Sequence, residues 1–264
     1  MKPLAELRDA QRIRGLLFDI DDTLTTEGQL TAQAYDAMEQ LKRAGKLLVP
    51  ITGRPAGWCD HIARMWPVDA VVGENGAFYF RFSEGKLHKT YRDADELRAR
   101  NRERLAAIGA RIVERIPGCA LASDQAYREA DLAIDYCEDV PPLPLETAER
   151  IAMLMRAEGL TAKVSSIHVN GWFGGYDKLA MTRQLFADAF KFSPDVLQRE
   201  FAFAGDSPND APMFEYFENS VGVANVARFA GRLEAEPKYV TLGSAGAGFA
   251  EIAAILLAQT SKGL

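Results

Sequence analysis

Cysteine and histidine are scarce in this sequence. Its 264 residues include only three cysteines, Cys59, Cys119 and Cys137, and three histidines. An odd number of widely separated cysteines excludes a disulfide framework, and neither residue type shows the spacing of zinc ligands. The pattern is typical of reduced thiols in an intracellular protein, so we expect a cytoplasmic location.

The sequence also lacks a long apolar run and an excess of basic residues. No stretch approaches the roughly 18 apolar residues that a membrane helix needs, and the polar N-terminus, MKPLAELRDAQRIRG, has no signal-peptide core. Basic residues number 31 against 37 acidic ones, a formal net charge of −6. This balance disfavours nucleic acid as a partner. We expect neither nucleic acid nor a membrane as a partner, and no pattern specifies the oligomeric state.

What remains is typical of a globular α/β protein. Hydrophobic residues make up 48% of the chain and charged residues 26%, a balance that favours a packed core. Patterns of buried strands alternate with helix patterns in the first 72 residues and again after residue 177. The strands are expected at 14–20, 46–52, 69–72, 200–204, 220–223 and 239–242, and the helices at 31–44, 55–66, 178–189, 211–218 and 248–258. This alternation predicts a doubly wound parallel sheet.

The middle of the chain does not continue the alternation of strands and helices. The aromatic run 76–82 predicts a hairpin, and 94–115 predicts a long helix whose arginine-rich face is solvated. Further on, we expect a strand at 131–136, a helix at 146–158 and two short strands within 162–173. The chain is therefore predicted to insert an α+β module, residues 82–176, into a core formed by 1–81 and 177–264.

Polar residues gather where the expected core strands end. In an open α/β sheet, ligands bind beyond the carboxyl ends of the strands. We therefore expect one site to contain Asp19, Asp21, Thr52, Gly53, Lys178, Asp206, Asn209 and Asp210.

These residue types favour phosphoryl transfer. Asp19 and Asp21 project to the same side of an extended chain, where they repel each other and any phosphate unless a cation such as Mg²⁺ lies between them. Asp206 can complete the metal shell. One of the paired carboxylates can attack phosphorus while the other protonates the leaving oxygen, and Lys178 can stabilise the transferring group. Taken singly, each acid is equally well explained as a turn or cap residue, so the interpretation depends on the whole set.

Four segments resemble the motifs of the haloacid dehalogenase (HAD) superfamily: FDIDDTLT (18–25), ITGRP (51–55), GYDKLAM (175–181) and GDSPND (205–210). The resemblance implies a HAD-like, Rossmann-like core in which Asp19 is the nucleophile and Asp21 the general acid/base. Thr52 and the Gly53 amide would bind the phosphoryl group, and Lys178 would neutralise charge. Asp19, the Asp21 carbonyl and Asp206 would hold Mg²⁺, supported by Asn209 and Asp210. The family often has glycine where this chain has Asp22.

The presence of Asp21 has a further implication. Superfamily members that attack carbon lack this acid, so it implies phosphoryl chemistry. The inserted module resembles the C2B cap of subfamily IIB (Cof-like), which includes sucrose-phosphate and mannosyl-3-phosphoglycerate phosphatases, and GENGAFYF (73–80) resembles the hairpin that enters such a cap. The implied activity is Mg²⁺-dependent hydrolysis of a small phosphorylated metabolite, a sugar or polyol phosphate, through an aspartyl-phosphate. A phosphomutase and a non-catalytic phosphate-ligand binding protein remain alternatives.

The candidates for substrate specificity lie mainly in the module. Ser166, His168 and Asn170 alternate along an expected strand and would share one face. This face would bind sugar hydroxyls or a second anionic group of the substrate, or would simply be the solvated face of a sheet. The further candidates are Asp124, Gln125, Arg128 and, in the core, Arg54, which we expect mainly to shape its turn.

Overall fold

The structure, a computed structural model, describes residues 1–258. Its main layer is a six-stranded sheet in which every neighbouring pair of strands is parallel. From edge to edge the strands are β1 (Lys2–Pro3), β13 (Tyr239–Val240), β12 (Asn219–Gly222), β11 (Phe201–Gly205), β2 (Gly15–Phe18) and β3 (Leu47–Pro50). The predicted doubly wound sheet is confirmed, although the pairing of the short strand β1 with β13 was not expected.

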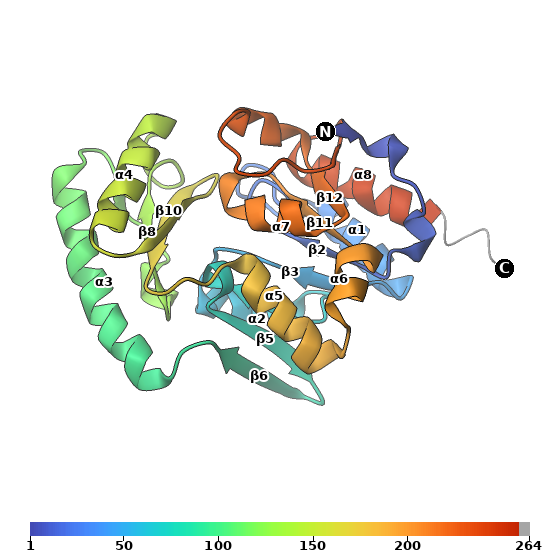
Figure 1. Cartoon of the computed structure of the whole chain (residues 1–264), viewed down its shortest axis with the longest axis horizontal. Coiled ribbons are helices and arrows are strands. Elements are labelled where there is room, and N and C mark those ends of the chain that lie inside the picture. The colour runs from blue at the N-terminus through green and yellow to red at the C-terminus, as the bar shows by residue number, and fades with distance from the viewer. Residues whose placement is uncertain (259–264) are drawn as a thin grey trace.

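Helices cover both faces of this sheet (Figure 1). In β2, Leu16 and Phe18 pack on one face and Leu17 on the other, as a strand buried on both sides requires. The first face is covered by α1 (Ala32–Arg43) and α8 (Ala245–Ala258), and the second by α5 (Lys178–Leu185), α6 (Pro194–Glu200) and α7 (Ala211–Tyr216). The polar residues that follow the strands therefore lie at one edge of the sheet, between two packed layers.

A three-stranded antiparallel sheet extends the core. It consists of β4 (Val71–Gly73), β5 (Phe78–Ser83) and β6 (Lys86–Tyr91), with α2 (Ala56–Met65) packed against it. The expected hairpin is present. The expected third strand is present as β4, and it joins the main sheet through a single parallel bridge between Ile51 and Val72.

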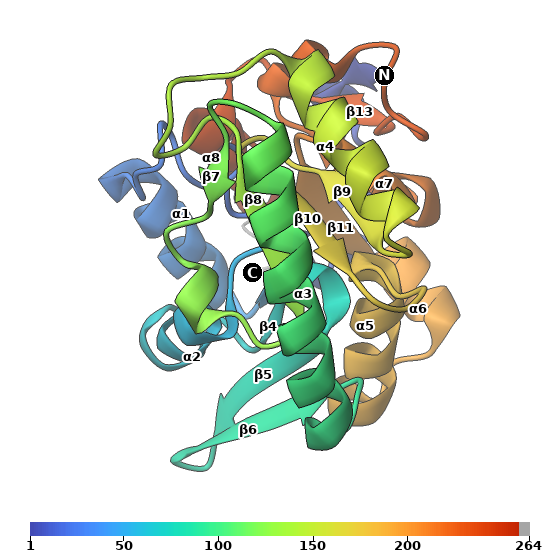
Figure 2. The ribbon, with the colours of Figure 1, turned by 90° about the vertical axis from the view of Figure 1, so that its left-hand side faces the viewer.

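The middle of the chain forms a separate sheet with two helices on one face (Figure 2). The strands follow the order β7 (Ala120–Leu121), β8 (Asp131–Asp135), β10 (His168–Trp172) and β9 (Thr161–Val164), and all their pairings are antiparallel. The helices are α3 (Asp95–Arg115) and α4 (Leu145–Ala157). We call residues 95–172 the module. The division into 1–81, 82–176 and 177–264 stays a prediction; because β6 pairs with β5 throughout, we propose a first boundary nearer residue 92.

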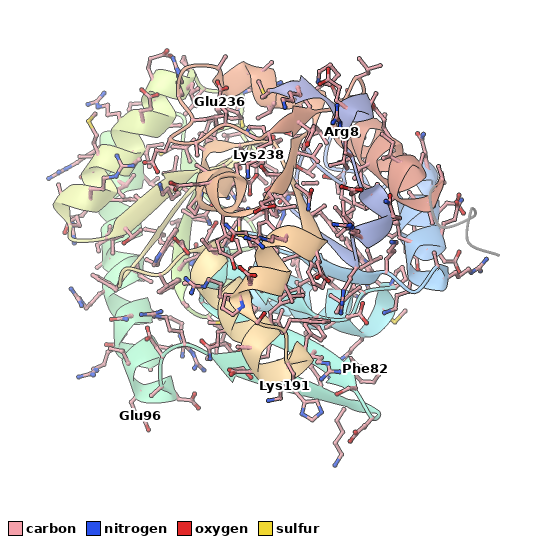
Figure 3. The ribbon with its side chains drawn as sticks, turned by 45° about the vertical axis from the view of Figure 1, so that its right-hand side comes forward. Arg8, Phe82, Glu96, Lys191, Glu236 and Lys238 are labelled. Atoms are coloured by element: carbon pink, nitrogen blue, oxygen red, sulfur yellow. The ribbon has the colours of Figure 1, made fainter. Side chains whose placement is uncertain are left out.

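The arginine-rich face of helix α3 is solvated as predicted, except at Arg98. Arg98 is buried, and its guanidinium carbon lies 3.6 Å from the ring centroid of Tyr91. The reason is that α3 starts directly above β6, whose aromatic ring offers a cation–π partner. Glu96, on the same turn, is labelled at that end of the helix in Figure 3.

Helix α5 ends differently from the prediction. It continues into a π-helical turn, Phe186–Phe190, whose Phe190 ring lies 5.4 Å from the guanidinium of Arg81 in β5. Lys191, which follows the turn, and Phe82 of the hairpin therefore lie at the same end of the molecule (Figure 3). Within residues 1–258, none of the helices has the length and hydropathy needed to span a bilayer.

Ion pairs join the module to the core on one flank. Lys163 of β9 lies 2.8 Å from Glu234, and Arg232 lies 3.0 Å from Glu146 of α4. A hollow of about 360 Å³ separates the two parts beside these pairs. Asp19 and Asp21, at the end of β2, line a separate cavity together with His168 and Asn170 of the module.

Candidate active site

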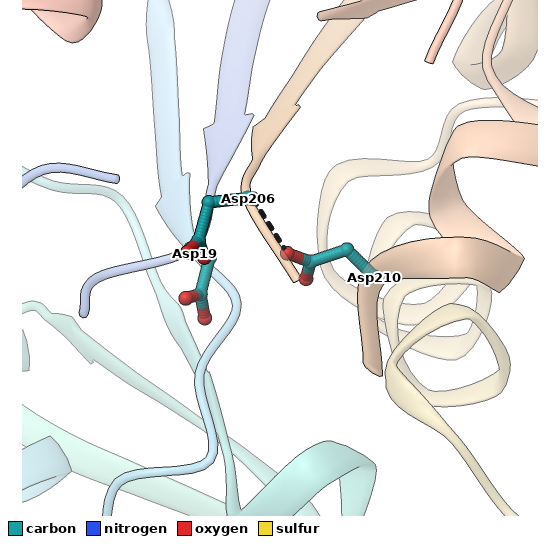
Figure 4. A group of neighbouring side chains, drawn as sticks. All are labelled: Asp19, Asp206 and Asp210. Atoms are coloured by element: carbon teal, nitrogen blue, oxygen red, sulfur yellow. Dashed lines mark hydrogen bonds between the residues drawn. The ribbon is translucent and has the colours of Figure 1, made fainter. Parts of the chain in front are cut away.

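Three buried aspartates meet at the ends of two neighbouring strands. Asp19 follows β2 and Asp206 follows β11, and the Asp19 N–H donates to the Ala204 carbonyl at 2.9 Å, which holds the two strand ends together. Asp210 faces them from the turn before α7 (Figure 4). One carboxylate oxygen from each aspartate lies within 4.8 Å of the others. Such a set of oxygen ligands suits a hard divalent cation.

Lys178 is the cation of this cluster. It is the first residue of α5, where the Asp177 side chain caps the helix by accepting from the Ala180 N–H at 2.8 Å. Its Nζ lies 2.8 Å from Asp19 Oδ1 and 2.7 Å from Asp210 Oδ1. The position at the helix start therefore fixes an ammonium between two of the three aspartates.

Asp210 has a supporting position. Its Oδ2 accepts from the N–H groups of Asp206 at 3.0 Å and Ser207 at 3.3 Å, the first of which is drawn in Figure 4. Since its Oδ1 accepts from Lys178, both oxygens already hold other parts of the site. Asp206 is oriented by Thr23 at 3.4 Å and by Asn225 Nδ2 at 3.2 Å.

The buried cluster holds more negative than positive charge. Burial raises the pKa of Asp19 to about 7, against the attraction of Lys178 and with the repulsion of Asp210 and Asp21. Burial, with the repulsion of Asp19, Asp210 and Asp22, raises the pKa of Asp206 well above its ordinary value, although Lys178 opposes the shift. Burial disfavours the Lys178 ammonium, but Asp19 and Asp210 raise its pKa above the ordinary value. A divalent cation would supply the positive charge that the three aspartates and one lysine lack.

Asp21 lies beside the cluster and is held by Arg54. Arg54 Nη2 lies 2.7 Å from Asp21 Oδ1, and Nε lies 2.9 Å from Oδ2. The chain turns after Asp21 because Asp22 adopts a left-handed backbone with φ of 55°. This conformation explains why glycine suits position 22, and aspartate tolerates it.

Thr52 and Gly53 form a tight turn after β3. The Thr52 hydroxyl accepts from the Arg54 N–H at 3.0 Å, and the Gly53 carbonyl accepts from Arg128 Nη1 at 2.8 Å. Asn209 comes to the same place from the other side and donates to Asn75 Oδ1 at 3.2 Å. The turn, Asn209 and the aspartates thus surround one small space.

Arg54 also connects the core to the module. Its guanidinium contacts Glu138 and lies 3.4 Å from Asp124, while Trp58 covers it at 4.4 Å. His168 Nε2 lies 2.8 Å from Glu138 Oε2. Burial disfavours the Glu138 carboxylate, yet its contacts with His168 and Arg54 lower its pKa to about 2.

The specificity candidates of the module divide into four kinds, of which Asp124 and Arg128 form the last. His168 and Asn170 lie on β10 and are buried against the core, so a solvated face is excluded for them. Ser166 lies in the turn before β10 rather than on the strand, which corrects the expected alternation. Gln125 bonds the backbone of Asp131 and Ala133, a structural role that its sequence position did not reveal.

Asp124 and Arg128 belong to a buried charge cluster. Arg128 lies 2.9 Å from both Asp124 and Asp131, and Asp131 accepts from Asn170 Nδ2 at 3.0 Å. Sequence reasoning missed Asp131, and it also missed Glu138 and Asn225. Glu138 follows β8 and Asn225 follows β12, so the strand-end rule applied to every strand could have found these two, whereas Asp131 begins β8 and is not selected by that rule.

The space above the acids is nearly closed. A cavity of about 10 Å³ is lined by Asp19, Asp21, Gly53, Arg54, Ser165, Ile167, His168, Asn170 and Asn209. It has room for one water molecule. A larger hollow of about 370 Å³ lies beside it, with Asp21, Arg54, Glu138, Ser166 and Arg228 among its lining residues. The module thus covers the aspartates, and the hollow marks where a larger group can lie next to them.

Comparison with known proteins agrees with this fold. Residues 16–99 match the model of a haloacid dehalogenase-like hydrolase family. Among solved structures, a HAD/COF-like hydrolase from Plasmodium vivax is similar over 97% of this chain and 99% of its own, with 16% identity and a TM-score of 0.69. The fold is that of the HAD-like hydrolases.

Two further structures carry sugar-phosphatase names. The sucrose-phosphatase from Synechocystis, solved with sucrose and phosphate, has 17% identity and a TM-score of 0.61 over 92% of this chain and 98% of its own. The C-terminal domain of trehalose-6-phosphate phosphatase from C. albicans has 14% identity and a TM-score of 0.69, covering 98% and 99%. No curated protein sequence matches significantly. The family model covers the first two of the four motifs, and likeness to solved structures at these identities establishes the fold.

Proposed function

We propose that this chain is a Mg²⁺-dependent phosphatase that hydrolyses a small phosphorylated metabolite, a sugar or polyol phosphate. The observation that carries the proposal is the buried cluster in which Lys178 bridges Asp19 and Asp210 beside Asp206. Such a cluster attracts a divalent cation and, with the cation in place, a phosphoryl group.

Asp19 is the nucleophile of the proposed reaction. Lys178 fixes its Oδ1, so the carboxylate is oriented toward the small cavity that it lines. A carboxylate oxygen attacks phosphorus, the bond from phosphorus to the leaving oxygen breaks, and an aspartyl-phosphate forms. The turn at Thr52 and Gly53, together with Lys178, stabilises charge on the transferring group.

Asp21 is the general acid and base. It donates a proton to the leaving oxygen in the first step and takes a proton from water in the second, when that water attacks phosphorus and frees Asp19. The contacts with Arg54 hold its carboxylate at the edge of the cavity. Asp19, the Asp21 carbonyl and Asp206 are the residues that would hold Mg²⁺, with Asn209 and Asp210 in support. Bound Mg²⁺ supplies positive charge to the phosphoryl oxygens.

The larger hollow supports a hydroxyl-rich leaving group. Its lining includes the carboxylates of Asp22, Glu27 and Glu138, which accept hydrogen bonds from hydroxyl groups. Two proteins of the same fold are named as a sucrose-phosphatase and a trehalose-6-phosphate phosphatase, and these names also support a sugar as the leaving group. Ser166 and Arg54 line the same hollow and are the specificity residues that we favour.

Release of orthophosphate from a panel of sugar and polyol phosphates tests the proposal. We expect turnover with Mg²⁺, none after chelation, and loss in Asp19→Asn. Asp36→Asn, an exposed acid on α1, is the matched control and should retain full activity. Turnover retained in Asp19→Asn would contradict the mechanism. Interconversion of isomers without phosphate release would show a phosphomutase, and phosphate binding without turnover would show a binding protein.

A further inference from the structure

Three consecutive residues after β4 have a left-handed backbone. Glu74 has φ of 43°, Asn75 of 53° and Gly76 of 105°. Glycine and asparagine tolerate this region, but glutamate rarely adopts it. Such strain persists only where the surroundings impose it, and it is concentrated at functional sites. The three residues are buried, and no step of the proposed reaction yet uses them.

Gly76 and Glu74 each contact a different part of the active site. A Cβ atom on Gly76 would lie 2.0 Å from the carbonyl oxygen of Asp177, so the loop packs directly on the residue before Lys178. Glu74 accepts from the N–H of Ala56 at 2.9 Å, at the start of α2. It also accepts from three N–H groups of the module, those of Glu129, Ala130 and Asp131.

Asn75 contacts the phosphate-binding turn. Its N–H donates to the Thr52 carbonyl at 3.1 Å, and its Oδ1 accepts from Asn209 Nδ2 at 3.2 Å. A Cβ atom on Gly53 would lie 3.1 Å from Asn75 Nδ2, so the Asn75 amide packs where any other residue at position 53 would have its side chain. Asn75 therefore joins two motifs that are about 150 residues apart in the chain and meet only at the site.

The amide nitrogen of Asn75 has an unusual environment. It is buried, and within residues 1–258 it has no hydrogen-bond partner. A buried donor without an acceptor is rare because it loses its bond to water and gains nothing in exchange. The donor lies beside Gly53, where the proposed function places a phosphoryl group.

We propose that Asn75 is a positioning residue for phosphoryl binding. It holds the Thr52–Gly53 turn against Asn209, and its Nδ2 gains an acceptor when a phosphoryl group occupies the turn. Glu74 fixes the same loop to the module, whose Arg128 holds the Gly53 carbonyl from the other side. The inference rests on the proposed function, since it assigns Asn75 to the phosphate of that reaction.

Binding of orthophosphate to the Mg²⁺-loaded protein, measured by calorimetry, tests this role without any turnover. Asn75→Asp keeps the size and tolerates the backbone but replaces the donor with a repelling oxygen. Asn75→Gly keeps the left-handed backbone and removes the amide. Asn219→Asp is the control, because Asn219 Nδ2 donates to the Arg199 carbonyl at the opposite edge of the sheet.

We expect the orthophosphate Kd to rise about tenfold in Asn75→Asp and about fivefold in Asn75→Gly, with KM rising more than kcat falls. Melting temperatures should stay close to that of Asn219→Asp. Unchanged Kd values in both Asn75 variants would overturn the proposal. So would losses of binding that merely parallel losses of melting temperature, since these would show a structural role only. If the unmodified protein itself bound no orthophosphate, the proposed function would fail first.

Discussion

Replacement of Arg54 by glutamine tests how the core and the module are coupled. The Arg54 side chain is 4% exposed and contacts three acids, Asp21, Asp124 and Glu138, whose side chains are 14%, 4% and 23% exposed. Removing one partner of a buried ion pair costs about 3–5 kcal/mol because the other charge stays buried. Since Asp21 and Glu138 reach water in part, we expect a loss in unfolding free energy of about 2–4 kcal/mol.

The same substitution should slow the reaction. General acid–base catalysis contributes about 10²- to 10⁴-fold, and Arg54→Gln keeps Asp21 but frees its carboxylate, so we expect kcat to fall about 10- to 100-fold. The kcat of Arg54→Lys should lie between those of the unmodified protein and Arg54→Gln, because a lysine ammonium keeps the charge but not the bidentate contact with Asp21. Urea unfolding and steady-state kinetics measure both effects.

A control variant isolates the contribution of burial. Arg64→Gln removes an arginine that pairs with Asp60 on the exposed face of α2, and it should change stability by less than about 0.5 kcal/mol. An Arg54→Gln protein as stable and active as Arg64→Gln would refute the reasoning, since it would show that the three acids do not depend on Arg54.

Further predictions concern the metal and the buried acids. Mg²⁺ at a hundred times its Kd should raise the unfolding free energy by about 2.7 kcal/mol, and Asp206→Asn should remove most of this gain. Thermal melts measure the effect, and an equal gain in Asp206→Asn would contradict the metal site. Burial and Asp131 raise the pKa of Glu74 to about 8, although Arg128 opposes the shift. Because the folded protein then holds a proton at Glu74 that the unfolded chain releases, Glu74 should lower the unfolding free energy as pH rises from about 5 to 8, and its own contribution is at most about 1.4 kcal/mol per pH unit. Glu74→Gln should flatten this slope, and an unchanged slope in urea titrations across this range would exclude Glu74 as its source.

Most of the core could be predicted because its strands are apolar on both faces. The run that contains Leu16, Leu17 and Phe18 admits only a buried element, and the motifs that follow such runs must share one edge. The structure does bring Asp19, Lys178, Asp206 and Asp210 together. Their chemical roles stay predictions that the proposed assays test.

The remaining features depend on contacts that no local pattern encodes. Strand β1 has two residues, too few for any periodicity. His168 and Asn170 alternate like the face of a solvated sheet, but the core covers them. Glu74 has a left-handed backbone that its residue type disfavours, and only the surrounding N–H groups explain it.

The cavity of about 10 Å³ above Asp19 has a kinetic consequence. In the proposed reaction a sugar phosphate cannot enter so small a space, so we expect the module to lift from the core to admit the substrate and again to free the product. With the module closed on the core, bulk solvent would be kept from the aspartyl-phosphate of that proposed reaction, and we expect a water admitted with the substrate to complete hydrolysis.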